Sequence, residues 1–330
     1  GAAYATEEEP MDIYVSAGTY FESIVMMDYI NIIGEDVEFT ILDGSGDVRV
    51  LTFHEVEGTS IQNLTIQNGY SPFGGGISIM NSDPLIENVI IKNNMADHEG
   101  GGVVNMWNSD AIFRNVQIYG NESEYGGGIL IWASSPTFNN VSITDNIATY
   151  DGAGMIVADA SAPIMNNVTI SNNTAGGNGG GIFIYYWSIP VLVNSIMWGN
   201  YPHEVYMYFD GGQYYESGGE AIIISHSSIE NGLSGMAYFG QQGVYWLEGN
   251  ITQNPLFEDI DDYNLNPNSP CIDAGTSSFE FWNTSFEIPG YMYVDGNGDG
   301  ISAPDMGAFE YIPNQQNENG DLNGDGSVNV

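Results

Sequence analysis

A repeat of about 26 residues runs through the middle of the chain and limits it to a small set of folds. The last glycine of a glycine cluster recurs at spacings of 26, 26, 26 and 27 residues, at Gly76, Gly102, Gly128, Gly154 and Gly181. A period in this range is typical of solenoids, propellers and arrays of small structural units. The first question is therefore which kind of repeat the chain forms.

Two sets of asparagines accompany the glycines. The first opens an Asn-x-hydrophobic pattern and comprises Asn63, Asn88, Asn115, Asn140, Asn167 and Asn194. A second set follows six positions later, at Asn94, Asn121, Asn146, Asn173 and Asn200. Asn tolerates the left-handed backbone conformation, and its amide can pair with the amide of a neighbouring repeat. We expect both sets to form structural ladders, with the glycines at a crowded corner or at positive φ.

Apolar residues alternate with period two around these positions, as in "NVTIS" and "GIFI". This alternation is typical of short strands. Three strands per repeat without an intervening helix make one coil of a parallel β-helix, in which equivalent side chains stack ~4.8 Å apart. A leucine-rich repeat would need a Leu-x-x-Leu-x-Leu frame, and a propeller would need longer blades. The sequence predicts an all-β solenoid of roughly ten coils with three short strands per coil.

The repeats resemble those of bacterial polymorphic outer-membrane proteins and related cell-surface proteins of the right-handed β-helix, pectin-lyase-like superfold. The segment Ile13 to Gly46 is similar to the first coils of that superfold, and Asn254 to Gly275 and Asp295 to Tyr311 are similar to terminal coils. The resemblance implies a right-handed parallel β-helix and an exported bacterial protein at the cell surface or outside the cell. It says less about activity, because this fold carries lyases, hydrolases, adhesins and inert scaffolds.

These observations divide the chain into three parts. Residues 1–12 form an N-terminal extension or cap, and residues 13–311 form the β-helix. Within the helix, the repeats are regular over about 59–200 and irregular, with long loops, over 201–311. Residues 312–330 form a tail whose end, "DLNGDGSVNV", resembles the opening of a dockerin-type calcium loop. The chain stops before position 12 of that loop, so the resemblance does not extend to cohesin binding.

The charge balance is strongly acidic, with 43 Asp and Glu against 3 Lys and Arg and a net charge of −40. Nucleic acids, anionic membranes and polyanionic substrates would be repelled, whereas cations would be attracted. No apolar run approaches the roughly 20 residues that span a bilayer. We therefore expect no nucleic-acid partner and no membrane insertion.

Two loops have the D-x-N-x-D-G pattern, in which oxygen ligands alternate and glycine allows a sharp turn around a hard cation. In the first loop Met306 stands where a bidentate Glu would be expected, so Asp305 or Glu310 would have to supply that oxygen. The alternative is an Asx-turn loop without metal. We expect one or two bound Ca²⁺ ions, with ligands among Asp295, Asn297, Asp299, Asp305, Asp321, Asn323, Asp325 and Asn329.

Catalytic groups are scarce in the sequence. A lyase would need a basic residue, and only Arg49, Lys92 and Arg114 are available. Arg114 occupies the position at which the preceding coil carries Glu87, which predicts an ion pair between coils. A glycosidase would need carboxylates on adjacent coils, and Asp151 looks isolated among its equivalents. We therefore expect the chain not to be an enzyme.

A group of aromatic residues lies four to six positions after the glycine corners, hence on one flank of the solenoid. Such rings can cover the core, contact another subunit or stack on sugars. The group comprises Trp107, Trp132, Tyr185, Tyr186 and Trp187.

The function expected from the sequence is that of a non-catalytic, calcium-stabilised structural or adhesive protein outside the cell. It would self-associate head-to-tail or laterally into a filament or matrix, or contact cell-surface or matrix glycans. The alternative is a polysaccharide-binding or polysaccharide-degrading lyase or glycosidase that uses the aromatic flank.

Overall fold

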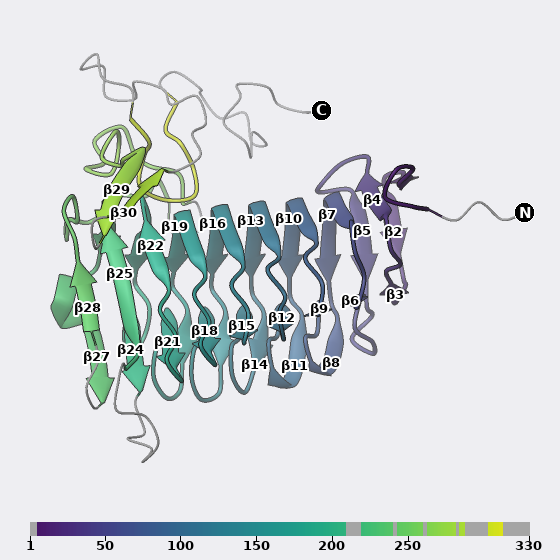
Figure 1. The fold of residues 1–330 in the computed structure, drawn as a ribbon, viewed down its shortest axis with the longest axis horizontal. Coiled ribbons are helices and arrows are strands. Elements are labelled where there is room, and N and C mark those ends of the chain that lie inside the picture. Colours follow the sequence, from purple (N-terminus) through teal and green to yellow (C-terminus); the bar gives the residue numbers. More distant parts are fainter. Residues whose placement is uncertain are drawn as a thin grey trace, which may run out of the picture.

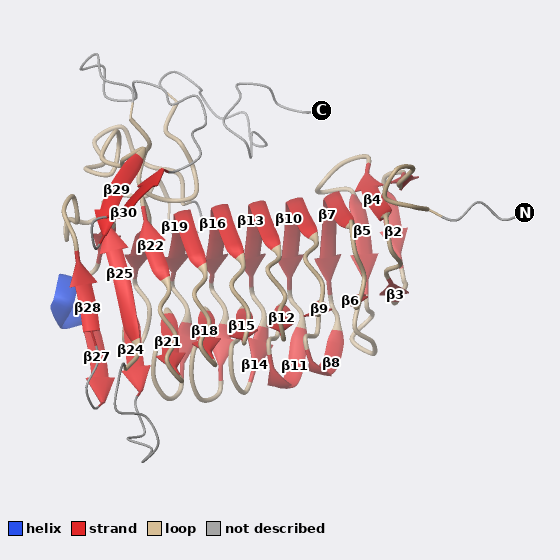
Figure 2. Cartoon of the chain, viewed as in Figure 1, coloured by secondary structure: helices blue, strands red, loops and turns tan. Residues whose placement is uncertain are grey.

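The computed structural model describes residues 5–208, 219–239, 243–259, 263–281, 284–287 and 303–312. These residues form an elongated stack of coils (Figure 1) with about eight turns. The predicted parallel β-solenoid is confirmed, with slightly fewer coils than the roughly ten expected. Strands dominate the described residues (Figure 2), and one short 3₁₀ helix, η1, spans Gly232–Gly235. None of the helical structure within those ranges is long and apolar enough to cross a membrane.

Three parallel sheets form the sides of the solenoid. The largest has 14 strands. Ten of them run in chain order along the solenoid: β1 (Met11–Val15), β4 (Ile30–Gly34), β7 (Ser60–Gln67), β10 (Leu85–Lys92), β13 (Ile112–Tyr119), β16 (Thr137–Thr144), β19 (Ile164–Ser171), β22 (Val191–Val193), β25 (Ala221–Ser225) and β28 (Gly243–Trp246). The other four are β2 (Gly18–Tyr20), β5 (Thr40–Asp43), β23 (Ile196–Trp198) and β26 (Ser228–Ile229).

The second side is a nine-stranded sheet, which carries the surface discussed below. Its strands are β3 (Ile24–Val25), β6 (Leu51–His54), β9 (Ile77–Met80), β12 (Val103–Met106), β15 (Ile129–Trp132), β18 (Met155–Ala158), β21 (Ile182–Tyr185), β24 (Val205–Tyr208) and β27 (Met236–Phe239).

The third side is short and has five strands: β8 (Tyr70–Phe73), β11 (Met95–Glu99), β14 (Glu122–Ser123), β17 (Ile147–Ala148) and β20 (Thr174–Ala175). After the parallel coils, β29 (Ser278–Phe281) and β30 (Thr284–Glu287) form an antiparallel hairpin.

The core lies inside the coils, where equivalent apolar side chains stack in register. Ile86 pairs with Phe113, and Phe113 pairs with Phe138. The two phenyl rings stack with centroids 4.8 Å apart, and all three side chains are fully buried. This stacking follows from the period-two alternation, which points one set of residues in each strand inward.

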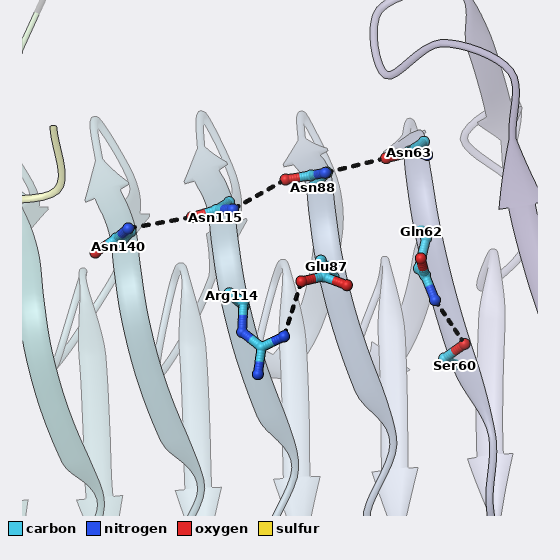
Figure 3. A network of polar contacts seen from close by, with 8 residues as sticks. All are labelled: Ser60, Gln62, Asn63, Glu87, Asn88, Arg114, Asn115 and Asn140. Atoms are coloured by element: carbon cyan, nitrogen blue, oxygen red, sulfur yellow. Dashed lines mark hydrogen bonds and ion pairs between the residues drawn. The ribbon is translucent and has the colours of Figure 1, made fainter. Parts of the chain in front are cut away.

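The first set of asparagines forms a ladder over only part of its length. Asn63, Asn88, Asn115 and Asn140 all have φ near +50°. The side-chain amides of Asn88, Asn115 and Asn140 each donate to Oδ1 of the preceding member, with bonds of 3.1, 3.1 and 3.2 Å (Figure 3). The left-handed backbone bends each long strand at this point.

The expected ladder does not continue to the last two members of this set. Asn167 donates to the carbonyl of Asp305 at 2.7 Å, and Asn194 exchanges hydrogen bonds with the backbone of Thr276. The physical reason is that C-terminal segments pack over this part of the long sheet and supply backbone partners in place of the next Asn. The ladder of six predicted from the sequence is therefore a ladder of four.

The second set of asparagines forms a more deeply buried ladder. The backbone N–H and Nδ2–H of Asn94 both donate to Oδ1 of Asn121 at 3.0 Å. The same pair of bonds joins Asn121 to Asn146 at 3.0 Å. The series continues through Asn173 to Asn200. Each member after Asn94 therefore satisfies two donors of the preceding asparagine inside the solenoid, where an unpaired donor would be costly.

The glycine clusters occupy the corner between the short sheet and the nine-stranded sheet. Gly100 has φ +66°, which favours glycine. Gly102 lacks this conformation, but a Cβ at this residue would lie 2.7 Å from the carbonyl oxygen of Gly128. The expected crowded corner with positive φ is confirmed.

Candidate functional site: the outer aromatic face

A second, smaller apolar cluster lies on the outward side of the nine-stranded sheet. The second residue of successive strands changes from Thr52 and Ser78 to Val104, Leu130 and Ile156. It then becomes aromatic at Phe183 and Tyr206, whose rings stack with centroids 5.5 Å apart. Val104, Leu130, Ile156 and Phe183 are themselves buried in a cluster separate from the core. The partly buried rings of Tyr125, Trp132, Tyr185 and Tyr206 pack against this cluster and form the outer surface. We call this surface, together with Tyr150 and Tyr186, the outer aromatic face.

Small residues let rings from distant coils meet on this face. Trp132 and Tyr185 occupy the same position in β15 and β21, two coils apart, with Ala158 between them. Because Ala158 leaves the space open, the two rings reach each other at 5.9 Å. Tyr186 lies against both, at 6.1 Å from Trp132 and 4.5 Å from Tyr185.

The structure brings together most of the aromatic group expected from the sequence. Trp187 extends it, with its ring 6.2 Å from Tyr186. Trp107 is joined to the group through its backbone N–H, which donates to the carbonyl of Trp132 at 3.0 Å. Tyr125 and Tyr150, which the sequence argument missed, add a second pair of rings 5.1 Å apart.

A column of residues at the glycine corner borders this face. Backbone N–H groups of Gly74, Gly100, Gly126 and Gly152 donate to the carbonyls of Glu99, Tyr125, Asp151 and Asn178 in the next coil. The residue just before each of these glycines therefore shares one column. Its members, in order along the solenoid, are Phe73, Glu99, Tyr125, Asp151 and Asn178.

Glu99 and Asp151 flank Tyr125 in this column. They are two coils apart, so their backbones are separated by roughly 10 Å at ~4.8 Å per coil. The pKa of the Tyr125 hydroxyl is raised chiefly by burial, with smaller contributions from the nearby Asp151 and Glu99 carboxylates. As expected from the sequence, the coils adjacent to Asp151 carry no carboxylate in this column, and Glu99 is the nearest one in it, two coils away.

The two carboxyl groups have different surroundings. Burial raises the pKa of Glu99, with a smaller opposing effect from His98. By contrast, Oδ1 of Asp151 accepts hydrogen bonds from the backbone N–H and Nδ2–H of Asn178, at 2.7 and 3.2 Å. A desolvated carboxyl with a raised pKa is suited to donating a proton, and a hydrogen-bonded carboxylate is suited to accepting one.

Glu99 also faces the aromatic cluster. Burial, followed by the Glu99 carboxylate, raises the pKa of Tyr185 well above its ordinary value. The hydroxyl of Tyr185 is therefore neutral and can donate or accept a hydrogen bond. Rings, hydroxyls and carboxyl groups thus occur side by side over β12 to β21.

The Lys and Arg side chains contact residues other than Glu99 and Asp151. Arg114 donates to Glu87 at 2.9 Å on the long sheet (Figure 3), which confirms the predicted ion pair. Lys92 lies 5.9 Å from the ring centre of Tyr119 on the same sheet. Arg49 donates to the carbonyls of Gly74 and Phe73 and to Ser71, so its guanidinium fixes the first glycine corner.

The expected calcium ligands lie mostly outside the described residues; these are Asp295, Asn297, Asp299, Asp321, Asn323, Asp325 and Asn329. Asp305 is described and buried, and its two carboxyl oxygens accept backbone N–H bonds from Asp273 and Tyr311. Burial and the nearby Glu310 raise the pKa of Asp305 to about 8. Within the described ranges, no group of three or more His, Cys, Asp or Glu residues is placed to hold a metal ion.

Comparison with known proteins supports the fold. The family model described as "Right handed beta helix region" matches residues 40–220. No curated protein matches the chain. Similar solved structures include pectate lyase Pel9A, with 14% identity, 92% of this chain and 86% of that chain covered, and a TM-score of 0.49.

Two pectin methylesterases are also similar. The enzyme from Yersinia enterocolitica has 11% identity over 70% of this chain and 77% of that chain, with a TM-score of 0.34. A mutant enzyme in complex with a hexasaccharide has 11% identity over 72% of this chain and 74% of that chain, with a TM-score of 0.38. At these identities the likeness is one of fold, so the acting residues have to be identified from the surface of this chain.

The expectation that the chain is not an enzyme is contradicted by these findings, since the solved structures named are those of a pectate lyase and two pectin methylesterases.

Proposed function

Since the chain belongs to the right-handed β-helix family, we propose that it is a polysaccharide-active protein that binds and cleaves a glycan on the outer aromatic face. The observation that carries this proposal is the position of Glu99 and Asp151 on either side of Tyr125, beside a cluster of aromatic rings. Sugar rings stack on aromatic side chains, and neighbouring carboxyl groups supply the acid and base for hydrolysis.

The shape of the face suits an extended chain. Its rings come from successive coils, from Tyr125 and Trp132 to Tyr206. Among the exposed rings, Tyr150 is 46% and Tyr186 is 37% accessible, so a glycan can reach them. A polymer lying along the solenoid would therefore contact several coils at once.

The carboxyl pair supports hydrolysis of a glycosidic bond. Glu99, in its protonated form, would donate its proton to the leaving oxygen as the bond from the anomeric carbon breaks. Asp151 would take a proton from the water that attacks the anomeric carbon. In glycosidases that invert configuration the two carboxyl groups are ~6.5–9.5 Å apart, which is slightly less than the roughly 10 Å that separates the backbones of Glu99 and Asp151.

Binding is tested with the exposed rings. The Tyr150→Ala/Tyr186→Ala double variant should bind polysaccharide about 10–30-fold more weakly, since each ring contributes ~1 kcal/mol. Affinity electrophoresis in gels containing polysaccharide measures this loss. The control is Tyr14→Ala, which removes a 76% exposed ring from β1. Equal mobility of the double variant and the control on every glycan that retards the parent would contradict the proposal.

Catalysis is tested with the carboxyl groups. Glu99→Gln should lower the release of reducing ends by at least about 100-fold, because general acid catalysis contributes a factor of this size or more. Binding should remain. Glu122→Gln, an exposed carboxylate in the same region of the solenoid, is the matched control and should retain activity. Full turnover by Glu99→Gln would remove this residue from the mechanism.

Localisation and self-association are further parts of the proposal. A polysaccharide-active protein of this kind would meet its substrate outside the cell or at the cell surface. Self-association of the solenoid, head-to-tail or laterally, stays a prediction that electron microscopy of the purified protein can test.

A further inference from the structure

The charges around the outer aromatic face are of one sign. Tyr125 lies between Glu99 and Asp151, and Tyr185 lies near Glu99 and Asp159. Glu124 is close to Tyr125 as well, and it pairs with His98 at 3.2 Å. The rings are therefore bordered by carboxyl groups on several sides.

Among the described residues, no Lys or Arg side chain on this face is available to pair with the carboxylates of a glycan. The entire chain has 3 Lys and Arg. Arg114 and Lys92 lie on the long sheet, where they contact Glu87 and Tyr119. Arg49 reaches the glycine corner, but its donors are directed to Gly74, Phe73 and Ser71. A uronate bound to the rings would thus face Asp151 and Asp159 without compensation.

A glycan with protonated amino groups would be attracted by the carboxylates of this face. A protonated amine is attracted by carboxylates and by the faces of aromatic rings, especially Trp and Tyr. Trp132, Tyr150 and Tyr186 provide such faces next to Asp151 and Asp159. The same residues that stack on sugars would then also recognise the positive charge.

We infer that the outer aromatic face selects glycans by charge and prefers polymers of amino sugars over neutral polymers, and neutral polymers over polyuronates. This inference rests on the proposed function, because it concerns the ligand of the same surface. It does not follow from the solved structures with a similar fold, whose names include a pectate lyase.

The test compares three hexasaccharides, made of glucosamine, glucose or galacturonic acid, by calorimetry at mildly acidic pH. The glucosamine hexamer should bind on the order of tenfold more tightly than the glucose hexamer at low salt, because several exposed charge pairs add up. Raising the salt from about 10 mM to about 150 mM shortens the screening length from ~30 Å to ~8 Å. Glucosamine binding should weaken with salt, and glucose binding should not change.

Variants separate the site from the acidity of the whole protein. Asp159→Asn, which leaves the proposed catalytic pair intact, should reduce the preference for glucosamine while leaving the affinity for glucose unchanged. Asp47→Asn/Asp110→Asn, which neutralises two exposed carboxylates elsewhere, should leave the preference intact.

The outcomes distinguish this inference from the proposed function. If the galacturonate hexamer binds most tightly, or the glucose and glucosamine hexamers bind equally, the inference is overturned and the proposed function stands. If glucosamine binding is undiminished in Tyr150→Ala/Tyr186→Ala, the amine is attracted to the acidic surface in general, which also overturns the inference. If none of the hexamers binds, the proposed function itself fails.

Discussion

At the scale of single residues, Glu204 accepts the hydrogen bonds of Asn200, the last member of the buried asparagine ladder. The backbone N–H and Nδ2–H of Asn200 donate to its two carboxyl oxygens, at 3.2 and 2.5 Å. Its side chain is almost completely buried, and burial raises its pKa to about 8, with Glu230 adding to the effect. A carboxyl group thus takes the place of the next asparagine, and near neutral pH it keeps its proton.

This raised pKa predicts a pH dependence of stability. The folded state holds a proton on Glu204 up to a pKa of about 8, whereas the unfolded chain releases it near 4.5. The stabilisation is therefore fully present below about pH 4.5 and is lost as the pH rises toward 8. Glu204→Gln, which stays neutral, should be more stable than the parent at pH 8 by on the order of a few kcal/mol.

Thermal melting of parent and variant between pH 4 and 8.5 measures this difference. The advantage of Glu204→Gln should grow with pH and vanish at the acidic end. Asp47→Asn, an exposed substitution, serves as the control for the loss of one charge from an acidic protein. A constant difference between parent and Glu204→Gln at every pH would contradict the assigned protonation.

At the scale of elements, the two asparagine ladders contribute differently although both have the same period. Asn121 is fully buried, and it accepts two bonds from Asn94 while its own amide donates to Asn146 and to the carbonyl of Ile91. Asn115 makes a single bond to each neighbour in its ladder. What Asn115 chiefly supplies is its left-handed backbone, with φ +53°.

Substitutions in the two asparagine ladders should therefore lower the free energy of unfolding by different amounts. Asn121→Ala leaves several buried donors and acceptors without partners and should lower the free energy of unfolding by ~3–5 kcal/mol. Asn115→Gly keeps the left-handed conformation and should cost about 1 kcal/mol. Urea unfolding followed by circular dichroism measures both values. Equal costs would mean that the two ladders are equivalent.

The elements were largely predictable, since the same residue types recur at the same offsets in every coil. The strands, the glycine corner and the Glu87–Arg114 pair all follow from the period. The ends of the two asparagine ladders could not be predicted in this way, because the hydrogen bonds of Asn167 and Glu204 involve residues that do not recur with the repeat. The column of Glu99 and Asp151 was missed for a related reason, since its residue type changes from coil to coil.

At the scale of the whole molecule, a net charge of −40 opposes compaction through self-repulsion. Calcium at the two D-x-N-x-D-G loops, around Asp295–Gly300 and Asp321–Gly326, would relieve part of this repulsion. These loops lie outside the described residues, so calcium binding remains a prediction from the sequence.

Removal of calcium should therefore lower the melting temperature. We expect a downward shift of several degrees in EGTA, since a ligand at 100 times its Kd stabilises by about 2.7 kcal/mol. Added Mg²⁺ at equal ionic strength is the control for charge screening, and it should not restore the melting temperature. Identical melting in calcium and EGTA would leave both loops without a structural ion.

The sequence also predicted the shape of the molecule better than its activity. The solenoid follows from local patterns, but the outer aromatic face forms only when β12 to β24 lie side by side. There Ala158 opens the space in which Trp132 meets Tyr185, and burial raises the pKa of Glu99. Burial and contacts of this kind depend on the packed coils and not on the spacing of residues in the chain.

The most direct measurement of the central claim is hydroxyl-radical footprinting of aromatic side chains with and without a saturating oligosaccharide. If the glycan lies on the outer aromatic face, Tyr125, Tyr150 and Tyr186 will be protected when it binds. Tyr14 and Tyr201, which are exposed elsewhere, will react as before. Protection of Tyr14 or Tyr201, with Tyr150 and Tyr186 unchanged, would place the glycan elsewhere and contradict the claim.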